Sequence, residues 1–311
     1  MVTNKEQNFI SAVVYVHNNE KQIRYFLNNV IAILQESFEK FEIICVNDKS
    51  TDNSTDKIKE VAKQSDGTLI SILNMSFFQG VELAMNAGVD LAIGDFVYEF
   101  DSIDIDYELE TILGIYKKSL TGFDIVSAAP YKAKRKFSRI FYSVFNSVSH
   151  NQYKLRTESF RILSRRAINR VHSMSKTIPY RKALYANCGL KLASIVYQTV
   201  QTNSSQYSKQ TNNNRKDMAV DSLILFTNLA SKATIIMTVI MMLATIFTAG
   251  YTVYIFALQR PVAGWTTTML FLSAAFFGLF LVLAIIIKYL SLLVDLVFKK
   301  QKYTIESIEK L

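Results

Sequence analysis

The sequence predicts an α/β domain, a mostly parallel sheet with helices on both faces, followed by a two-helix transmembrane hairpin. Three observations support this prediction. Apolar, β-rich runs alternate with segments of helical periodicity in the first third of the chain, short polar clusters follow three of these runs, and the C-terminal third contains two long uncharged stretches. Strands that alternate with helices are typical of a parallel sheet covered on both faces.

The predicted elements follow one another in the order strand, helix, strand. We expect the first helix in residues 19–38, where apolar residues recur at helical spacing, and the second in residues 50–65, which open with a capping residue. The third helix is expected in residues 79–94, with Gly94 closing it. The strands are the runs FISAVVYV (9–16), FEIICVND (41–48), TLISILN (68–74) and DFVYEF (95–100).

Two apolar stretches near the C-terminus predict the hairpin. The first has no charged residue between Lys232 and Arg260, and the second runs uncharged from Trp265 to Lys288. Each is long enough to cross a hydrocarbon layer, which takes roughly 20 apolar residues. The alternative is two buried helices of a soluble bundle, but such helices normally show a polar stripe, and neither stretch has one.

Basic residues indicate the orientation of the hairpin. They precede the first span and follow the second, whereas the connecting loop contains only Arg260. The positive-inside rule therefore predicts a multi-pass protein of the cell membrane with both termini in the cytoplasm. The expected parts are a cytoplasmic domain (1–212), an amphipathic juxtamembrane segment (213–230), the hairpin (231–291) and a cytoplasmic tail (292–311).

The formal net charge of +9 narrows the classes of partner. Basic residues gather beside the apolar stretches and in YKAKRKFSR (131–139), a distribution that favours anionic lipid head groups or phosphorylated substrates over nucleic acid. The two cysteines and three histidines lie far apart and show no metal-ligand spacing. The composition thus points to a membrane-associated protein that handles phosphates.

Polar clusters follow three of the predicted strands. HNNE ends the first strand, NDKSTD the second and DSIDID the fourth. Ligands of parallel sheets bind at the carboxyl ends of the strands, where the loops leave toward the helices. The three clusters are therefore expected to form one site.

These segments resemble the family 2 glycosyltransferases. AVVYVHNNE is similar to their V-V-P-V-Y-N-E-E, FEIICVNDKSTDNS to E-I-I-F-V-D-D-G-S-T-D-G-T, and NAGVDLAIGDFVYEFDSID to A-G-L-D-A-A-x-G-D-x-V-x-x-M-D-A-D. RPVAGWTT between the two spans is similar to the polyprenyl-phosphate glycosyltransferase branch. The resemblance implies a GT-A domain that transfers a sugar, with inversion, from a nucleotide sugar, expected to be a UDP-sugar, to polyprenyl phosphate for cell-surface glycan assembly.

The resemblance also implies a divalent cation, Mg²⁺ or Mn²⁺, held by a D-x-D motif. Asp101 falls on the first acid of that motif, Ile103 on the second, and Asp106 on a further family acid. Asp104 lies one residue after the second position, and it is either a metal ligand or a solvated turn residue. The expected metal ligands are Asp101, Asp104 and Asp106, and the first two are the expected catalytic residues.

Two further sets of residues are expected to bind phosphate-bearing substrates. Those for the nucleotide are Asn18, Glu20, Asn47 and Asp48, and those for the acceptor phosphate are Lys132, Arg135, Arg139 and Arg161. Ser50, Thr51 and Asp52 are expected to cap a helix rather than bind donor. The basic residues of 132–139 also fit a general lipid-facing patch.

Four positions depart from the family pattern, namely Asn47, Ile103, Pro130 and Ser159. They leave a second hypothesis open, in which the chain is a catalytically impaired homologue that binds lipid phosphate or acts as a scaffolding or regulatory subunit. Whether the protein forms a homo-oligomer is also left open.

Overall fold

A computed structural model describes residues 5–65, 67–131, 156–174, 181–200 and 303–311, together with scattered positions between 240 and 293. The chain forms two compact units, one of Met1–Ala219 with Gln301–Leu311 and one of Val220–Lys300. The described positions between 240 and 293 are helical. Among the described residues no helix has the length and apolarity that a membrane span requires. Most of the predicted hairpin and all of segment 213–230 lie outside the described residues.

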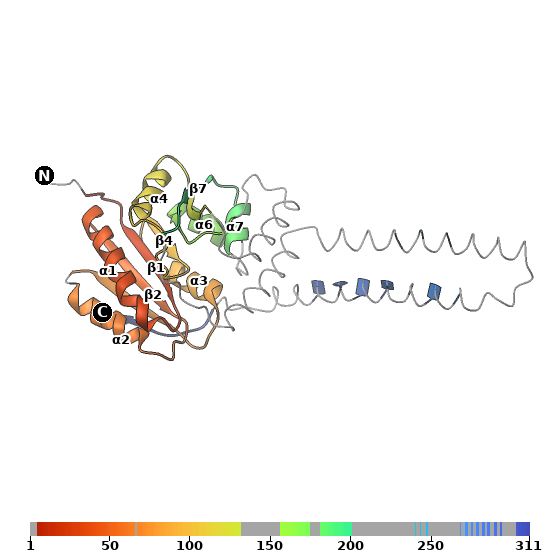
Figure 1. Ribbon diagram of the computed structural model, residues 1–311, viewed down its shortest axis with the longest axis horizontal. Helices are drawn as coiled ribbons and strands as arrows, with labels where there is room; N and C mark the ends of the chain where they lie inside the picture. Colours follow the sequence, from red (N-terminus) through yellow and green to blue (C-terminus); the bar gives the residue numbers. More distant parts are fainter. Residues whose placement is uncertain are drawn as a thin grey trace, which may run out of the picture. The chain divides into compact units, whose positions relative to one another are not determined.

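The first unit is built on one mixed sheet with the strand order β7-β5-β6-β4-β1-β2-β3-β8. Figure 1 labels β1, β2, β4 and β7 of this sheet. The four strands expected from the sequence are confirmed and are parallel, with β1 between β2 and β4 and with β3 beyond β2. The strand bounds are β1 Ile10–Val16, β2 Phe41–Asn47, β3 Leu69–Met75, β4 Phe96–Phe100, β5 Ile125–Pro130, β6 Phe160–Ser164, β7 Leu192–Tyr197 and β8 Ile305–Lys310.

Antiparallel pairing extends the sheet on both sides of the parallel strands. On one side β6 lies antiparallel between β4 and β5, and β7 pairs parallel with β5. On the other side β8 pairs antiparallel with β3. The sheet therefore incorporates the C-terminal residues, which follow the second unit in the chain.

Helices cover both faces of the sheet, as the sequence predicts. Their bounds are α1 Glu20–Ser37, α2 Ser54–Gln64, α3 Val81–Leu91, α4 Glu110–Leu120, α6 Arg165–Met174 and α7 Arg181–Asn187. Alternate residues of each strand point to opposite faces. Ile10 and Val14 of β1 belong to the core cluster that includes buried residues of α1, α2 and α4. Val13 points to the other face, where α3 packs on β1 and β2.

The third helix ends before Gly94, which corrects the expected role of that glycine. The helix stops at Leu91, and Ala92 is extended. Gly94 lies at the entrance to β4, where its N–H donates to Ser11 Oγ at 2.8 Å. A Cβ at this position would lie 2.6 Å from the backbone nitrogen of Ser11. Close approach to β1, rather than helix termination, therefore requires glycine here.

Gly88 lets α3 approach the sheet. A Cβ at Gly88 would collide with Val13 Cγ1 and lie 2.6 Å from Val46 Cγ2. Valine side chains are stiff about χ1 and cannot easily turn away. At Gly114 of α4, by contrast, the nearest atom to an added Cβ is Ile195 Cδ1 at 3.7 Å, an ordinary contact.

We expect Gly88→Ala to lower the free energy of unfolding by about 1–3 kcal/mol through overpacking. Gly114→Ala is the matched control, and it should raise stability by about 0.4–1 kcal/mol because it only restricts the unfolded chain. Thermal unfolding of the purified full chain, followed by circular dichroism, measures both. Equal stability of the two variants would contradict the close packing of α3.

Candidate functional site

The turns that leave β1 and β2 lie side by side, because Val16 and Asn47 are register partners. Each turn contains a residue in the left-handed region, Asn18 and Lys49, both with φ of 53°. This conformation is uncommon outside glycine, and residues other than glycine that adopt it cluster at functional sites. The Asn18 Oδ1 atom accepts a hydrogen bond from the Thr51 N–H at 2.8 Å, so that each turn holds the other in place.

Asp52 connects the starts of two helices. Its carboxylate accepts the N–H of Ser54, the first residue of α2, at 3.1 Å and the N–H of Glu20, the first residue of α1, at 2.9 Å. Burial raises the pKa of Asp52, hydrogen bonds from Ser54 and Glu20 lower it, and the net pKa is below the usual value. Asp52 thus has the expected contact at the start of α2 and extends it to α1, whereas Ser50 and Thr51, which were expected to cap the same helix, contact Asn18 instead.

Asp48 is fully buried at the end of β2. Its carboxylate accepts hydrogen bonds from the Tyr15 hydroxyl at 2.9 Å and from the N–H groups of Gln79 and Gly80, both at 2.8 Å. Burial raises its pKa above the usual value, although these hydrogen bonds favour the charged form. Asp48 therefore fixes the loop of residues 76–80, which precedes α3.

The other predicted nucleotide residues lie around Asp48. The Asn47 side chain donates to Asn74 Oδ1 at 2.9 Å and accepts from the Ser50 N–H at 3.0 Å. Asn18 is exposed and Glu20 is half-buried. The structure thus brings Asn18, Glu20, Asn47 and Asp48 to the carboxyl ends of β1 and β2.

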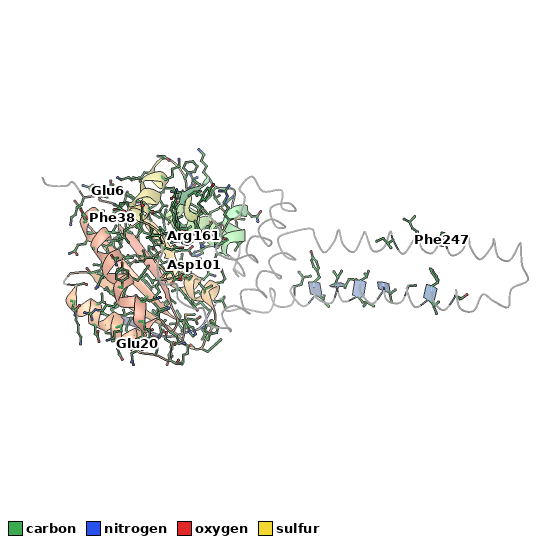
Figure 2. The ribbon with its side chains drawn as sticks, in the orientation of Figure 1. Glu6, Glu20, Phe38, Asp101, Arg161 and Phe247 are labelled. Atoms are coloured by element: carbon green, nitrogen blue, oxygen red, sulfur yellow. The ribbon has the colours of Figure 1, made fainter. Side chains whose placement is uncertain are left out.

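Next to β1 in the sheet, β4 ends in a buried ion cluster that joins Glu99, Asp101, Arg161 and Arg181. Arg161 donates to Glu99 at 2.6 Å and to Asp101 at 2.7 Å, and Arg181 donates to the other oxygen of each acid at 2.6 Å. Each of the four carboxylate oxygens therefore accepts from a different guanidinium nitrogen. In Figure 2 the labelled Asp101 and Arg161 lie next to one another.

More charged groups surround these four side chains. Arg161 also contacts Glu158 at 3.2 Å, and Arg181 contacts Glu82 at 2.9 Å. The Tyr185 hydroxyl donates to Glu99 at 2.9 Å. Lys182 lies 3.9 Å from Glu158. Among the described residues the contacted acids, Glu82, Glu99, Asp101 and Glu158, outnumber the basic groups, Arg161, Arg181 and Lys182.

Burial and charge act against one another in this cluster. Burial raises the pKa of Asp101, but Arg161 and Arg181 lower it more, and the result lies well below the usual range. Burial likewise lowers the pKa of both arginines, while Asp101 and Glu99 raise it well above the ordinary value. All three side chains are therefore charged at neutral pH.

The predicted metal ligands do not form one group. Asp101 is engaged with the arginines, Asp104 accepts from Ser102 Oγ at 3.1 Å, and Asp106 accepts from the Tyr197 hydroxyl at 2.8 Å. Ile103, at the second position of the family motif, is only 4% exposed and belongs to the apolar core. In the described ranges no three His, Cys, Asp or Glu side chains could together hold a metal ion. In this arrangement each of the three acids accepts hydrogen bonds from protein donors, and the assignment of a cation to them stays a prediction.

The predicted acceptor residues divide in two. Arg161 is 1% exposed, and its guanidinium contacts Glu158, Glu99 and Asp101. Lys132, Arg135 and Arg139 lie outside the described residues. Ser159 stands where the family has an acid, and its hydroxyl lies 3.5 Å from an Asp106 carboxylate oxygen. A carboxylate from another segment of the chain therefore lies beside this position.

Sequence reasoning missed Glu99 and Arg181, the other two members of the cluster. The sequence contained a signal for Glu99, because a charged residue inside the apolar run FVYEF needs a partner when it is buried. Arg181 had no such signal, because its contacts with Glu99 and Asp101 form only in the folded chain.

Comparison with known proteins places this geometry in a family context. A family model described as Glycosyl transferase family 2 matches residues 11–188. The chain is 26% identical over 194 residues to an uncharacterised glycosyltransferase of Synechocystis sp., covering 60% of each protein. It is 28% identical over 194 residues to a prophage bactoprenol glucosyl transferase homologue of Escherichia coli, covering 60% of this chain and 62% of the relative. The match thus spans less than two thirds of these relatives.

The fold is also that of a solved structure. It is similar to a mannosyltransferase of Pyrobaculum calidifontis, solved in complex with GDP-Man and Mn²⁺, with a TM-score of 0.51 and 15% identity. The match covers 95% of this chain and 89% of the other. At this identity the likeness shows a common fold.

We expect Asp101→Asn to lower the free energy of unfolding by about 3–5 kcal/mol, because it leaves two buried guanidinium groups without one counter-charge. Since the pKa of Asp101 is depressed on folding, its stabilising effect is present above the unfolded value of about 3.9 and is lost as the pH falls through the lower folded value. Wild-type stability should therefore fall more steeply than that of the variant below about pH 4.

Asp56→Asn, at an exposed position in the first turn of α2, is the matched control and should change stability little. Thermal unfolding of the purified full chain at several pH values measures both variants. Equal stability of Asp101→Asn and Asp56→Asn would contradict the buried cluster.

We expect nucleotide-free protein to bind no Mn²⁺ tightly, because both oxygens of Asp101 already accept from arginine. Electron paramagnetic resonance of free Mn²⁺ during a titration measures this directly. One ion bound per chain, and lost in Asp101→Asn but not in Asp56→Asn, would show that a cation displaces the arginines.

Proposed function

The chain belongs to glycosyl transferase family 2, and we propose that it transfers a sugar from a nucleotide-sugar donor to polyprenyl phosphate with inversion at the anomeric carbon. The observation that carries the proposal is the pair of interlocked turns at the ends of β1 and β2, inside the segment that matches the family. The names of the relatives support the acceptor, since the E. coli protein is named a bactoprenol glucosyl transferase homologue. A UDP-sugar is the proposed donor.

The nucleotide is proposed to lie over the two turns. Asn18 and Glu20 present amide and carboxylate groups suited to a base edge and ribose hydroxyls. The buried Asn47 and Asp48 act by holding the turns and the loop of residues 76–80. The side chain of Asn18 is thus the most direct contact that the described residues offer.

The transfer does not require a strong general acid or base. An oxygen of the ionised acceptor phosphate attacks the anomeric carbon, a new carbon–oxygen bond forms, and the bond to the donor diphosphate breaks with its electron pair leaving on the nucleoside diphosphate. An ionised phosphate needs no general base. A serine at position 159, in place of the family acid, is compatible with this chemistry.

We assign the binding of the negatively charged phosphates to the basic segment of residues 132–139, and this assignment rests on the sequence. Lys132, Arg135 and Arg139 supply the cationic groups that such a site requires. Arg161 is instead proposed to hold the end of β4, since its guanidinium is bound by buried carboxylates. The predicted hairpin would place this chemistry at the cytoplasmic face of the cell membrane, for cell-surface glycan assembly.

A second candidate function is favoured by the ion cluster. In a catalytically impaired homologue, Asp101 only forms ion pairs within the buried cluster, and Ile103 only packs in the apolar core. Such a protein would bind nucleotide or lipid phosphate without transfer and act as a scaffolding or regulatory subunit.

We expect the purified full chain in lipid to form labelled, lipid-linked sugar from a UDP-sugar and undecaprenyl phosphate. Parallel reactions with GDP-sugars, and with and without Mn²⁺, define the donor. Absence of labelled lipid with every common donor, while nucleotide is still bound, would contradict transfer and favour the second candidate.

Asn18→Gly tests the donor site, because glycine keeps the left-handed backbone and removes the amide, together with the hydrogen bond that this amide accepts from Thr51. The donor KM should rise about tenfold, as expected for the loss of one or two hydrogen bonds. Asn29→Ala, on the exposed side of α1, is the control. An unchanged KM in Asn18→Gly would contradict the donor contact.

A further inference from the structure

The C-terminal strand β8 lies at the edge of the sheet beside β3, next to the proposed donor pocket. In sequence it is separated from β3 by more than two hundred residues, including the whole of the second unit. An edge strand of this kind adds little core, since five of its six residues are exposed. Burial of apolar surface therefore does not explain why β8 is held in this place by polar contacts.

The first contact joins β8 to the loop of residues 76–80. The Gln79 side chain donates to the Thr304 carbonyl at 2.7 Å and accepts from the Thr304 N–H at 3.0 Å. The Ser76 N–H donates to the same carbonyl at 3.1 Å. The backbone of Gln79 in turn donates to Asp48. The loop is thus held between Asp48 on one side and Thr304 on the other.

This loop carries an aromatic side chain toward the first turn. The ring centroids of Phe78 and His17 lie 4.6 Å apart, and His17 Nδ1 lies 2.7 Å from the Asp48 carbonyl oxygen. Phe78 is half-buried. Aromatic rings at such positions can stack on bases. Moving the loop would move this ring pair relative to Asn18.

Two further sets of contacts link β8 to the end of β2, one through Asn74 of β3 and one directly. Asn74 donates to Ser307 at 3.0 Å and to Glu309 at 2.9 Å, and it accepts from Asn47. Lys49 pairs with Glu306 at 2.9 Å, although both side chains are more than half exposed. Asn47 and Lys49 are therefore connected to β8, the first through Asn74 and the second directly. Asp48 is connected through Gln79 to Thr304, the residue before β8.

We propose that β8 is a positioning element of the donor pocket, and that Thr304, through Gln79, sets the shape of the loop of residues 76–80. The inference rests on the proposed function, because it takes the turns of β1 and β2 as the donor site. The Thr304 carbonyl accepts the N–H of Ser76 from this loop, and the backbone N–H and carbonyl of Thr304 both pair with the Gln79 side chain, so that Thr304 fixes the loop at two residues. Because β8 follows the second unit directly in the chain, the donor pocket is completed only by residues that come after that unit.

Two variants test the positioning role from opposite sides of the contact. Thr304→Pro removes the N–H that Gln79 accepts, and Gln79→Met removes both side-chain hydrogen bonds at nearly constant volume. Lys59→Gln is the matched control, because it breaks the ion pair of β8 with α2, Lys59 to Glu309 at 2.7 Å, and leaves the loop untouched. Binding of UDP and of GDP to each full-length protein is measured by isothermal titration calorimetry.

The expected result is a Kd for nucleotide that is about five to ten times higher in Thr304→Pro and Gln79→Met, as one or two lost hydrogen bonds would produce. The bound stoichiometry, the acceptor KM and the binding by Lys59→Gln should stay at the wild-type values. A merely structural role would lower the stoichiometry and the thermal midpoint without changing Kd.

Unchanged Kd in a folded variant, with binding in the wild type, would overturn the positioning role alone. Absence of UDP and GDP binding by the wild type would overturn the proposed function together with it. If Thr304→Pro fails to fold, Gln79→Met still decides the question, because its substitution lies outside any strand.

Discussion

The buried carboxylate of Glu99 is the constraint on which the end of β4 depends. A charge in this low-dielectric position must be paired and hydrogen-bonded, or the fold loses several kcal/mol. Glu99 is paired by Arg161 from β6 and Arg181 from α7, and both arginines continue to Asp101. The acid that resembles the first member of a metal motif is thus part of an ion network that holds three segments together.

A buried acid that must be hydrogen-bonded also orders the neighbouring turns at the ends of β1 and β2, with fewer charged groups. Asp48 is buried and accepts three hydrogen bonds, and through Gln79 it fixes a loop that Thr304 holds from the other side. In both places a buried acid at the carboxyl end of a strand orders segments that are distant in sequence. The difference lies in the partners. Arginines surround Asp101, whereas neutral donors surround Asp48.

Local patterns were sufficient to predict the centre of the fold. Apolar runs and helical spacing gave the four parallel strands and the first three helices, and the polar clusters gave the edge where the turns of β1 and β2 meet. They could not give β8, because IESIEK has no buried face to mark it as a strand, and its pairing depends on β3. Nor could they give the arginine pair, since charge pairing between positions 99, 161 and 181 arises only in three dimensions. Gly94 was misassigned because a glycine needed for close approach has the same sequence signal as one that ends a helix.

The most direct test of the account is a double-mutant cycle between Asp101 and Arg181, using Asp101→Asn and Arg181→Gln in urea unfolding of the purified chain. The contact of 2.6 Å predicts that the double variant loses clearly less stability than the sum of the single losses, with a coupling free energy of about 0.5–3 kcal/mol. Losses that simply add would mean that the two side chains are not coupled, which would contradict the ion cluster at the end of β4.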